Sequence, residues 1–202
     1  AAIVGAGAWG TGLAVALARA GVEVELGCRT QEQVDAIVRD GVNAHYLPGV
    51  ALPETVSVTR ASELALDRAD LVCFAVPAAA LPVAVGAHAE AIEPSSGVVV
   101  LSKGLVAPHG MLPSAYVAAR VDARAVACIG GPGHAGDALR SGAALVVGSE
   151  DEVFAMQLKR LLKETGFDAT TTTDVAGVEL AGTAKNAAAL AAAAAGVNGP
   201  NA

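Results

Sequence analysis

Short apolar runs bounded by turn residues recur along the chain, and helix-like segments lie between them. Together they predict a sheet interleaved with helices. Short runs that are apolar throughout, such as Leu71-Val-Cys-Phe-Ala-Val76, are typical of parallel strands covered on both faces. We predict strands at residues 3–4, 22–26, 56–59, 71–76, 98–101, 125–129, 144–147 and 167–172. We predict helices at residues 11–20, 31–40, 81–92, 111–119 and 151–165, and a last helix from near residue 174. Strands that alternate with helices indicate an α/β fold with a doubly wound sheet.

A glycine-rich turn follows the first predicted strand. The strand leads into Gly5, Gly7 and Gly10, an alanine-rich helix follows, and a second strand comes after Gly21. In a βαβ dinucleotide site, Gly5 permits the tight turn, Gly7 lets a pyrophosphate approach the backbone, and Gly10 lets the helix pack close to the sheet. The alternative is a glycine turn without a ligand. The order of strand, turn, helix and strand favours binding of NAD or NADP.

The end of the second predicted strand slightly favours NADP over NAD. An NAD-preferring site usually has an acidic side chain there that binds the ribose hydroxyls. This chain has Arg29 instead, and residues 26–30 contain no carboxylate. A guanidinium pairs bidentately with a phosphate, so Arg29 can bind the 2′-phosphate of NADP. The alternative is a solvated surface arginine.

Two lysines and one small-residue loop are candidates for binding an anionic substrate. Lys103 directly follows a predicted strand, where ligands gather in open α/β sheets. Lys185 lies among alanines and glycines of the last predicted helix, and we expect such an enclosed lysine to have a lowered pKa and to transfer protons. Backbone N–H groups of loop 130–135 can approach a phosphate closely. The structural alternatives are a solvated loop charge for Lys103, a wet helix face for Lys185, and a structural role for His134 in the loop.

Composition narrows the function classes. The 202 residues are 53% hydrophobic and 16% charged, enough to bury one full core and part of a second. The net charge of −7 argues against a nucleic-acid partner or an anionic membrane surface. Cys28, Cys73 and Cys128 form no CxxC pair, so we expect reduced, buried thiols and no metal site. The longest apolar tract, residues 187–197, is too short for membrane insertion, and no signal peptide is apparent, so we expect a cytoplasmic protein.

The two ends of the sequence suggest a piece of a longer protein. The first residue is not Met, and the sequence starts almost directly on a predicted strand. The segment from Asp174 onward is helical with no strand after it. We therefore expect a Rossmann-type dinucleotide-binding domain in residues 1–173. Residues 174–202 would begin an all-α C-terminal substrate domain, of which only the first helix is present.

Six motifs, in order along the chain, resemble those of bacterial-type NAD(P)-dependent glycerol-3-phosphate dehydrogenase. The motifs are Gly5-Ala-Gly-Ala-Trp-Gly-Thr11, Asn43-Ala-His-Tyr-Leu-Pro-Gly49, Ala75-Val-Pro77, Ser102-Lys-Gly-Leu105, Gly131-Pro132 with Ala135, and Asp174 through Gly177-Val-Glu179 to Gly182-Thr-Ala-Lys-Asn186. The resemblance covers essentially the whole chain. It implies reversible hydride transfer between NAD(P)H and dihydroxyacetone phosphate, giving sn-glycerol 3-phosphate. It also implies a small phosphorylated substrate as partner and leaves a homodimer open.

The resemblance further implies roles for individual residues. Cofactor contacts are implied for Gly5, Gly7, Ala8, Trp9, Gly10, Arg29, Tyr46, Pro77, Lys103 and Ala135. Substrate contacts are implied for Lys103, Gly131, Gly133, Lys185 and Asn186, with Lys185 as the general acid/base. The chain departs from the family where Gly130 and Gly133 replace hydroxyl residues and Asp137 replaces a glutamate. The family's later aspartate and its phosphate-binding arginine–asparagine pair would lie beyond residue 202.

Two other functions remain open. One is a different dehydrogenase of the same two-domain build, acting on a small hydroxy acid or sugar phosphate. The other is a catalytically silent nucleotide-binding relative. Retention of both Lys103 and Lys185 argues against the silent protein. We also expect these 202 residues alone to bind the cofactor without turning over substrate.

Overall fold

The computed structural model describes the backbone of residues 1–131 and 133–197, and the side chains of these residues except 186–187, 189–190 and 192–197. The strands in this part are β1 (Ala2–Val4), β2 (Val24–Cys28), β3 (Val56–Arg60), β4 (Leu71–Phe74), β5 (Gly97–Val100), β6 (Ala125–Gly130), β7 (Ala144–Ser149) and β8 (Asp168–Thr172). The α-helices are α1 (Ala8–Arg19), α2 (Gln31–Asp40), α3 (Leu81–His88), α4 (Pro113–Ala118), α5 (Ala135–Ser141), α6 (Glu152–Glu164) and α7 (Val175–Val197). Short 3-10 helices lie at Ala61–Glu63, Leu66–Arg68 and Ala89–Ala91.

All eight of these strands join one sheet, in the order β3-β2-β1-β4-β5-β6-β7-β8. Strands β1 to β6 are parallel, β7 runs antiparallel to β6, and β8 is parallel to β7. The strand order reverses between β1 and β4, and ligands of open α/β sheets bind outside the carboxyl ends of strands at such a point. The predicted doubly wound sheet is confirmed. The antiparallel β7 was not predicted, because an apolar run carries no information about strand direction.

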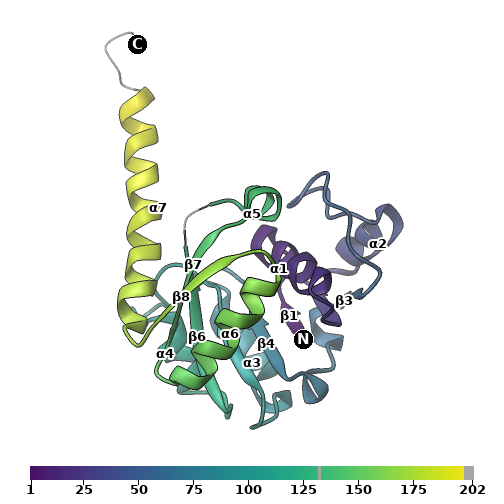
Figure 1. Cartoon of the computed structure of the whole chain (residues 1–202), viewed down its shortest axis with the longest axis horizontal. Coiled ribbons are helices and arrows are strands. Elements are labelled where there is room, and N and C mark those ends of the chain that lie inside the picture. Colours follow the sequence, from purple (N-terminus) through teal and green to yellow (C-terminus); the bar gives the residue numbers. More distant parts are fainter. Residues whose placement is uncertain (132, 198–202) are drawn as a thin grey trace.

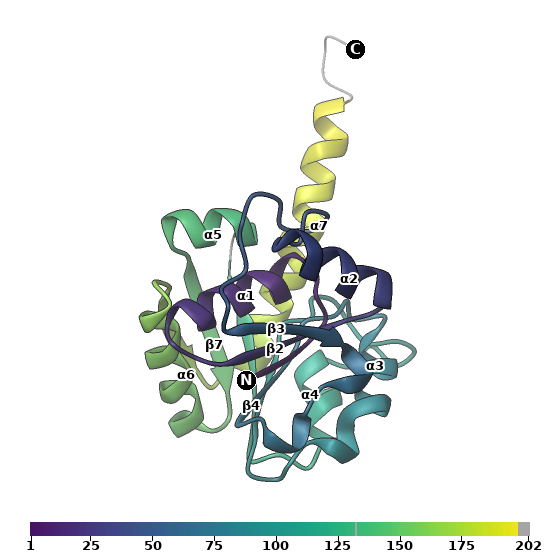
Figure 2. The same ribbon diagram turned by 90° about the vertical axis from the view of Figure 1, so that its right-hand side faces the viewer.

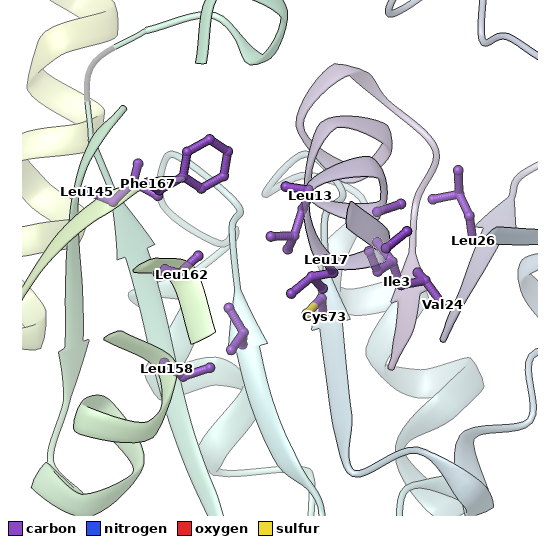
Figure 3. Close-up of a cluster of buried hydrophobic side chains, with 14 of the residues drawn as sticks. Ile3, Leu13, Leu17, Val24, Leu26, Cys73, Leu145, Leu158, Leu162 and Phe167 are labelled. Atoms are coloured by element: carbon purple, nitrogen blue, oxygen red, sulfur yellow. The ribbon is translucent and has the colours of Figure 1, made fainter. Parts of the chain in front are cut away.

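Two apolar cores cover the two faces of the sheet. Successive side chains of a strand point to opposite faces, so Cys73 of β4 lies in one core and its neighbours Val72 and Phe74 lie in the other. Helices α1 and α6 cover the first face, and α3 and α4 cover the second (Figures 1 and 2). Figure 3 labels residues of the first core: Ile3, Leu13, Leu17, Val24, Leu26, Cys73, Leu145, Leu158, Leu162 and Phe167.

Most predicted elements are present, with shifted ends. Helix α2 has the predicted bounds, but α1 begins three residues earlier than predicted, at Ala8. Helix α5 was not predicted, because its sequence follows a glycine loop and is short. It packs on α1 so closely that a Cβ added at Gly12 would lie 2.9 Å from the Cβ of Ala135.

Helix α7 starts on the sheet and continues beyond it. Asp174 accepts a hydrogen bond from the Gly177 N–H at 2.9 Å, which caps the first turn. Val178 then lies against β6, where a Cβ at Gly130 would be 2.7 Å from Val178 Cγ1. Past this contact the helix projects away from the carboxyl edge of the sheet (Figure 1). A helix from near Asp174 is thus confirmed, while the domain boundary stays a prediction.

The expected burial of the three cysteines is confirmed. Cys28, Cys73 and Cys128 are buried and free, and burial raises the pKa of the Cys28 thiol to about 11. Among the described residues, no helix is both long and apolar enough to cross a membrane.

Candidate functional site

The glycine turn between β1 and α1 separates structural glycines from an open one. Gly5 has φ +113°, and a Cβ there would lie 2.7 Å from the Ala75 carbonyl oxygen beyond β4. A Cβ at Gly10 would lie 1.9 Å from the Gly5 carbonyl oxygen. At Gly7, by contrast, an added Cβ meets no described atom within 4 Å. Gly5 and Gly10 therefore permit the fold, and Gly7 leaves free space in front of the helix.

That free space adjoins the N-terminal end of α1. Gly7 is the N-cap residue in an extended conformation, and Thr11 N–H donates to its carbonyl at 2.9 Å. The N–H groups of Ala8, Trp9 and Gly10 precede this bond and have no acceptor within the helix. A helix end of this kind attracts anions through its free N–H groups and its partial positive charge.

A cavity begins where β2 ends. It has a volume of about 420 Å³, and its lining includes Arg29, Gln33, Asn43 and Tyr46. The Arg29 and Tyr46 side chains are exposed, and the ring of His45 meets that of Tyr46 edge-on with centroids 4.5 Å apart. The structure therefore brings the predicted cofactor residues Arg29 and Tyr46 together.

Lys103 follows β5 at the carboxyl edge of the sheet. Burial lowers its pKa, and the positive charge of Lys185 lowers it further. Lys103 lines a small cavity together with Trp9 and Gly131. A Cβ at Gly182 of α7 would lie 4.0 Å from Lys103 Nζ. Two predicted substrate lysines from distant parts of the chain thus lie near each other.

Lys185 lies in a different environment from the one expected. The sequence predicts a lysine enclosed by small apolar side chains, whereas the Lys185 side chain is exposed. That expectation is wrong because the adjacent Ala184 is exposed as well, so within the described residues this side of α7 is not covered. Lys185 does line a cavity of about 450 Å³, together with Gly131, Thr172 and Asp174. The half-buried lysine with the lowered pKa is Lys103.

Two side chains of the sixth motif, for which the sequence predicted no individual role, attach α7 to the rest of the site. Thr183 Oγ1 accepts a hydrogen bond from the N–H of Gly104, the residue after Lys103, at 3.2 Å. Glu179 is buried and accepts two hydrogen bonds from Ser114 at the start of α4. The available signal was a carboxylate at position 179 in a helix made mostly of small apolar residues.

The remaining predicted residues have varied surroundings. Pro77 is exposed just after β4, Ala135 is buried against α1, and Gly133 is exposed in the loop before α5. Asn186 belongs to α7, but its side chain lies outside the described residues. Within the described part of the chain, no group of three or more His, Cys, Asp or Glu side chains could hold a metal ion.

The sequence comparisons identify one family. A family model described as the N-terminus of NAD-dependent glycerol-3-phosphate dehydrogenase matches residues 1–155. An NAD(P)+ glycerol-3-phosphate dehydrogenase of Streptomyces griseus is 40% identical over 194 residues, which are 95% of this chain and 58% of that protein. Its counterpart in Thermus thermophilus is 38% identical over 192 residues, with the same shares.

A solved structure matches as well. The crystal structure of glycerol-3-phosphate dehydrogenase from Coxiella burnetii has a TM-score of 0.82 and 31% identity, covering 90% of this chain and 56% of that one. The chain thus spans a little more than half the length of these relatives. The chain belongs to the family of NAD-dependent glycerol-3-phosphate dehydrogenases, whose N-terminal part it matches.

Proposed function

We propose that this chain binds NADP or NAD and contributes to hydride transfer between NAD(P)H and dihydroxyacetone phosphate, which gives sn-glycerol 3-phosphate. The open N-terminal end of α1 at Gly7 carries the proposal. It lies at the carboxyl end of β1, beside the reversal of strand order where dinucleotides bind in such sheets. The relatives named above have this activity in their names.

The described residues fit a dinucleotide. The free space at Gly7 suits a pyrophosphate, because no side chain blocks the N–H groups of the first turn. The cavity at Arg29 and Tyr46 suits an adenosine with a 2′-phosphate, since a guanidinium matches a phosphate and an aromatic ring gives apolar contact. When bound, the nicotinamide would supply the hydride.

The two lysines would handle the charges of the substrate. An anion beside Lys103 would stabilise the charged form that burial disfavours. Following the family resemblance, the Lys185 ammonium would donate its proton to the carbonyl oxygen that becomes a hydroxyl, and would stabilise the negative charge that develops there. Lys103 would then act as a fixed positive charge. Gly131 lines the cavities of both lysines, so its backbone can approach the substrate without a side chain in between.

The setting of this reaction is also a proposal. Three buried free thiols suit the reducing cytoplasm. The partner we propose is a small phosphorylated molecule, and a homodimer remains a prediction.

The test uses a protein of the same length as the relatives, in which this chain forms the N-terminal part. Oxidation of NADPH with dihydroxyacetone phosphate is followed for wild type, for Lys185→Met, and for Lys163→Met as a matched exposed lysine on α6. We expect Lys185→Met to lower kcat about 100-fold or more with the Kd for NADP+ unchanged, the usual scale of general acid catalysis. Near-normal turnover in Lys185→Met, or an equal loss in Lys163→Met, would refute the catalytic role.

A further inference from the structure

One carbonyl oxygen in the glycine turn accepts two side-chain hydrogen bonds. The Ala6 oxygen accepts from Asn43 Nδ2 at 2.9 Å and from Gln33 Nε2 at 3.0 Å. The second Asn43 hydrogen goes to Thr11 Oγ1 at 2.8 Å. Asn43 is 2% exposed, so both hydrogens of its amide group are used inside the protein.

These bonds determine which way the next peptide N–H points. A carbonyl oxygen has two lone pairs, and both side-chain amides donate to this one. In a trans peptide the C=O and the following N–H point in opposite directions. The Gly7 N–H therefore points away from Asn43 and Gln33, and within the described residues no group accepts a hydrogen bond from it. It is the first N–H group at the open end of α1.

Gln33 also connects this peptide to the end of β2. Its side-chain Oε1 accepts a hydrogen bond from the backbone N–H of Arg29 at 3.4 Å. The backbone N–H of Gln33 donates to Thr30 Oγ1 at 3.3 Å. The backbone at Arg29 and the Ala6–Gly7 peptide are thereby held by one side chain. The two parts of the proposed cofactor site have a fixed relation to each other.

We propose that Asn43 and Gln33 are positioning residues that hold the Ala6–Gly7 peptide with its N–H directed at the cofactor pyrophosphate. Asn43 borders the cavity at Arg29 with very little of its surface, and both hydrogens of its amide group are already bound inside the protein, so we assign it a role through this peptide. The inference rests on the proposed function, because it names the residues that prepare the same site. Preorganised donors bind an anion more tightly than donors that must first be oriented.

The test measures two ligands on folded variants of this chain. NADP+ contains the pyrophosphate, and adenosine 2′-phosphate lacks it. The variants are Asn43→Leu, Gln33→Met and the control Gln31→Met. Gln31 lies on α2 like Gln33, and within the described part of the chain its side chain bonds only Asp35. Circular dichroism and Tm establish that each variant is folded. If Asn43→Leu does not fold, Gln33→Met carries the test.

We expect both Asn43→Leu and Gln33→Met to raise the Kd for NADP+ about tenfold, the scale of one hydrogen bond to a charged group. Asn43→Leu should leave the Kd for adenosine 2′-phosphate within about twofold, a change too small to count as a lost hydrogen bond, and Gln31→Met should change neither Kd. An unchanged NADP+ Kd in the folded variants, or equal losses of both ligands in Asn43→Leu, would overturn the inference. A wild type that binds neither ligand would refute the proposed function, and the inference with it.

Discussion

The buried Glu179 carboxylate accepts a hydrogen bond from the Ser114 N–H at 2.9 Å and another from Ser114 Oγ at 2.7 Å. These bonds join α7 to the start of α4. One turn further along α7, Thr183 holds the backbone beside Lys103. The position of Lys185 relative to Lys103 therefore depends on a carboxylate that contacts neither lysine directly.

Replacing Glu179 should change how stability depends on pH. Burial raises its pKa above the ordinary value of 4.5, against the opposing effect of the Ser114 hydrogen bonds. The folded state then binds more protons than the unfolded state in this window, so stability falls as pH rises from 4.5 through the folded pKa. Glu179→Gln can keep both bonds, accepting from the N–H and donating to Oγ. We expect it to lose this pH dependence and to exceed wild type in stability at pH 8.

Urea unfolding between pH 4.5 and 8 measures the effect, and the difference between wild type and Glu179→Gln isolates this group. Glu179→Ala is the second variant. It leaves the Ser114 N–H without its acceptor and should cost about 1–3 kcal/mol throughout the range. A Glu179→Gln protein with the same pH slope as wild type would contradict the assignment.

Lys103 should cost stability, because it is a cation in a half-buried position. Burial is the larger cause of its lowered pKa, and the Lys185 charge is the second. The cost is fully present below the folded pKa and is relieved as pH rises toward 10.5, where the unfolded state still holds its proton. We expect Lys103→Met to raise the Tm at pH 7. Inorganic phosphate should raise the Tm of wild type more than that of the variant.

Differential scanning fluorimetry with and without phosphate measures both effects, and Lys163→Met controls for the loss of an exposed lysine. A lower Tm for Lys103→Met, or equal stabilisation of both proteins by phosphate, would contradict this interpretation.

Gly10 should be structurally indispensable. The added Cβ of Gly10→Ala would lie 1.9 Å from the Gly5 carbonyl oxygen, so α1 or the turn must shift. We expect a loss of at least about 2 kcal/mol in unfolding free energy, the scale of overpacking in a tight interior. In Gly86→Ala of α3 the added Cβ meets no described atom within 4 Å, and this control should gain about 0.5–1 kcal/mol. Equal urea midpoints for the two variants would show that the turn is less tight than described.

The fold was predictable where a local pattern decides it. The run around Cys73 is apolar throughout, which is what a parallel strand buried on both faces requires. In the structure its side chains do alternate between the two cores. Strand direction at β7 and the existence of α5 depend on contacts distant in sequence, such as Gly12 with Ala135. The apolar run of β7 and the short sequence of α5 therefore could not reveal them.

The candidate site was predictable from its motifs but not from its supports. Glycine spacing and strand-end charges pointed to Gly7, Arg29 and Lys103. The exposure of Lys185 depends on which parts of α7 other elements cover, and the sequence of the helix alone does not encode those contacts. The Glu179–Ser114 pair joins residues 65 positions apart, and no periodicity in the sequence links them.

Arg29 should decide between the two cofactors. Arg29→Asp replaces a guanidinium that pairs with a 2′-phosphate by a carboxylate that repels it and can bind ribose hydroxyls. We expect the ratio of Kd values for NADP+ and NAD+ to shift at least about tenfold toward NAD+. Calorimetric titration of both cofactors measures it, with Arg160→Asp on α6 as an exposed control. An unchanged ratio would remove Arg29 from the site.

Gly7 offers the sharpest separation of binding from folding. Its φ of −79° and ψ of −173° are accessible to any residue, and its Cβ position meets no described atom within 4 Å. Gly7→Val should therefore fold as wild type does, while its side chain fills the space proposed for the pyrophosphate. Gly86→Val is the matched control, since that glycine also has open space around its Cβ position and lies on α3.

The most direct test of the central claim is calorimetric titration of NADP+ into wild type, Gly7→Val and Gly86→Val, with the Tm of each measured in parallel. We predict that wild type and Gly86→Val bind NADP+ equally, and that Gly7→Val binds at least about 100-fold more weakly with an unchanged Tm, because the pyrophosphate loses the helix end. A folded Gly7→Val that binds NADP+ as tightly as wild type would contradict cofactor binding at this turn.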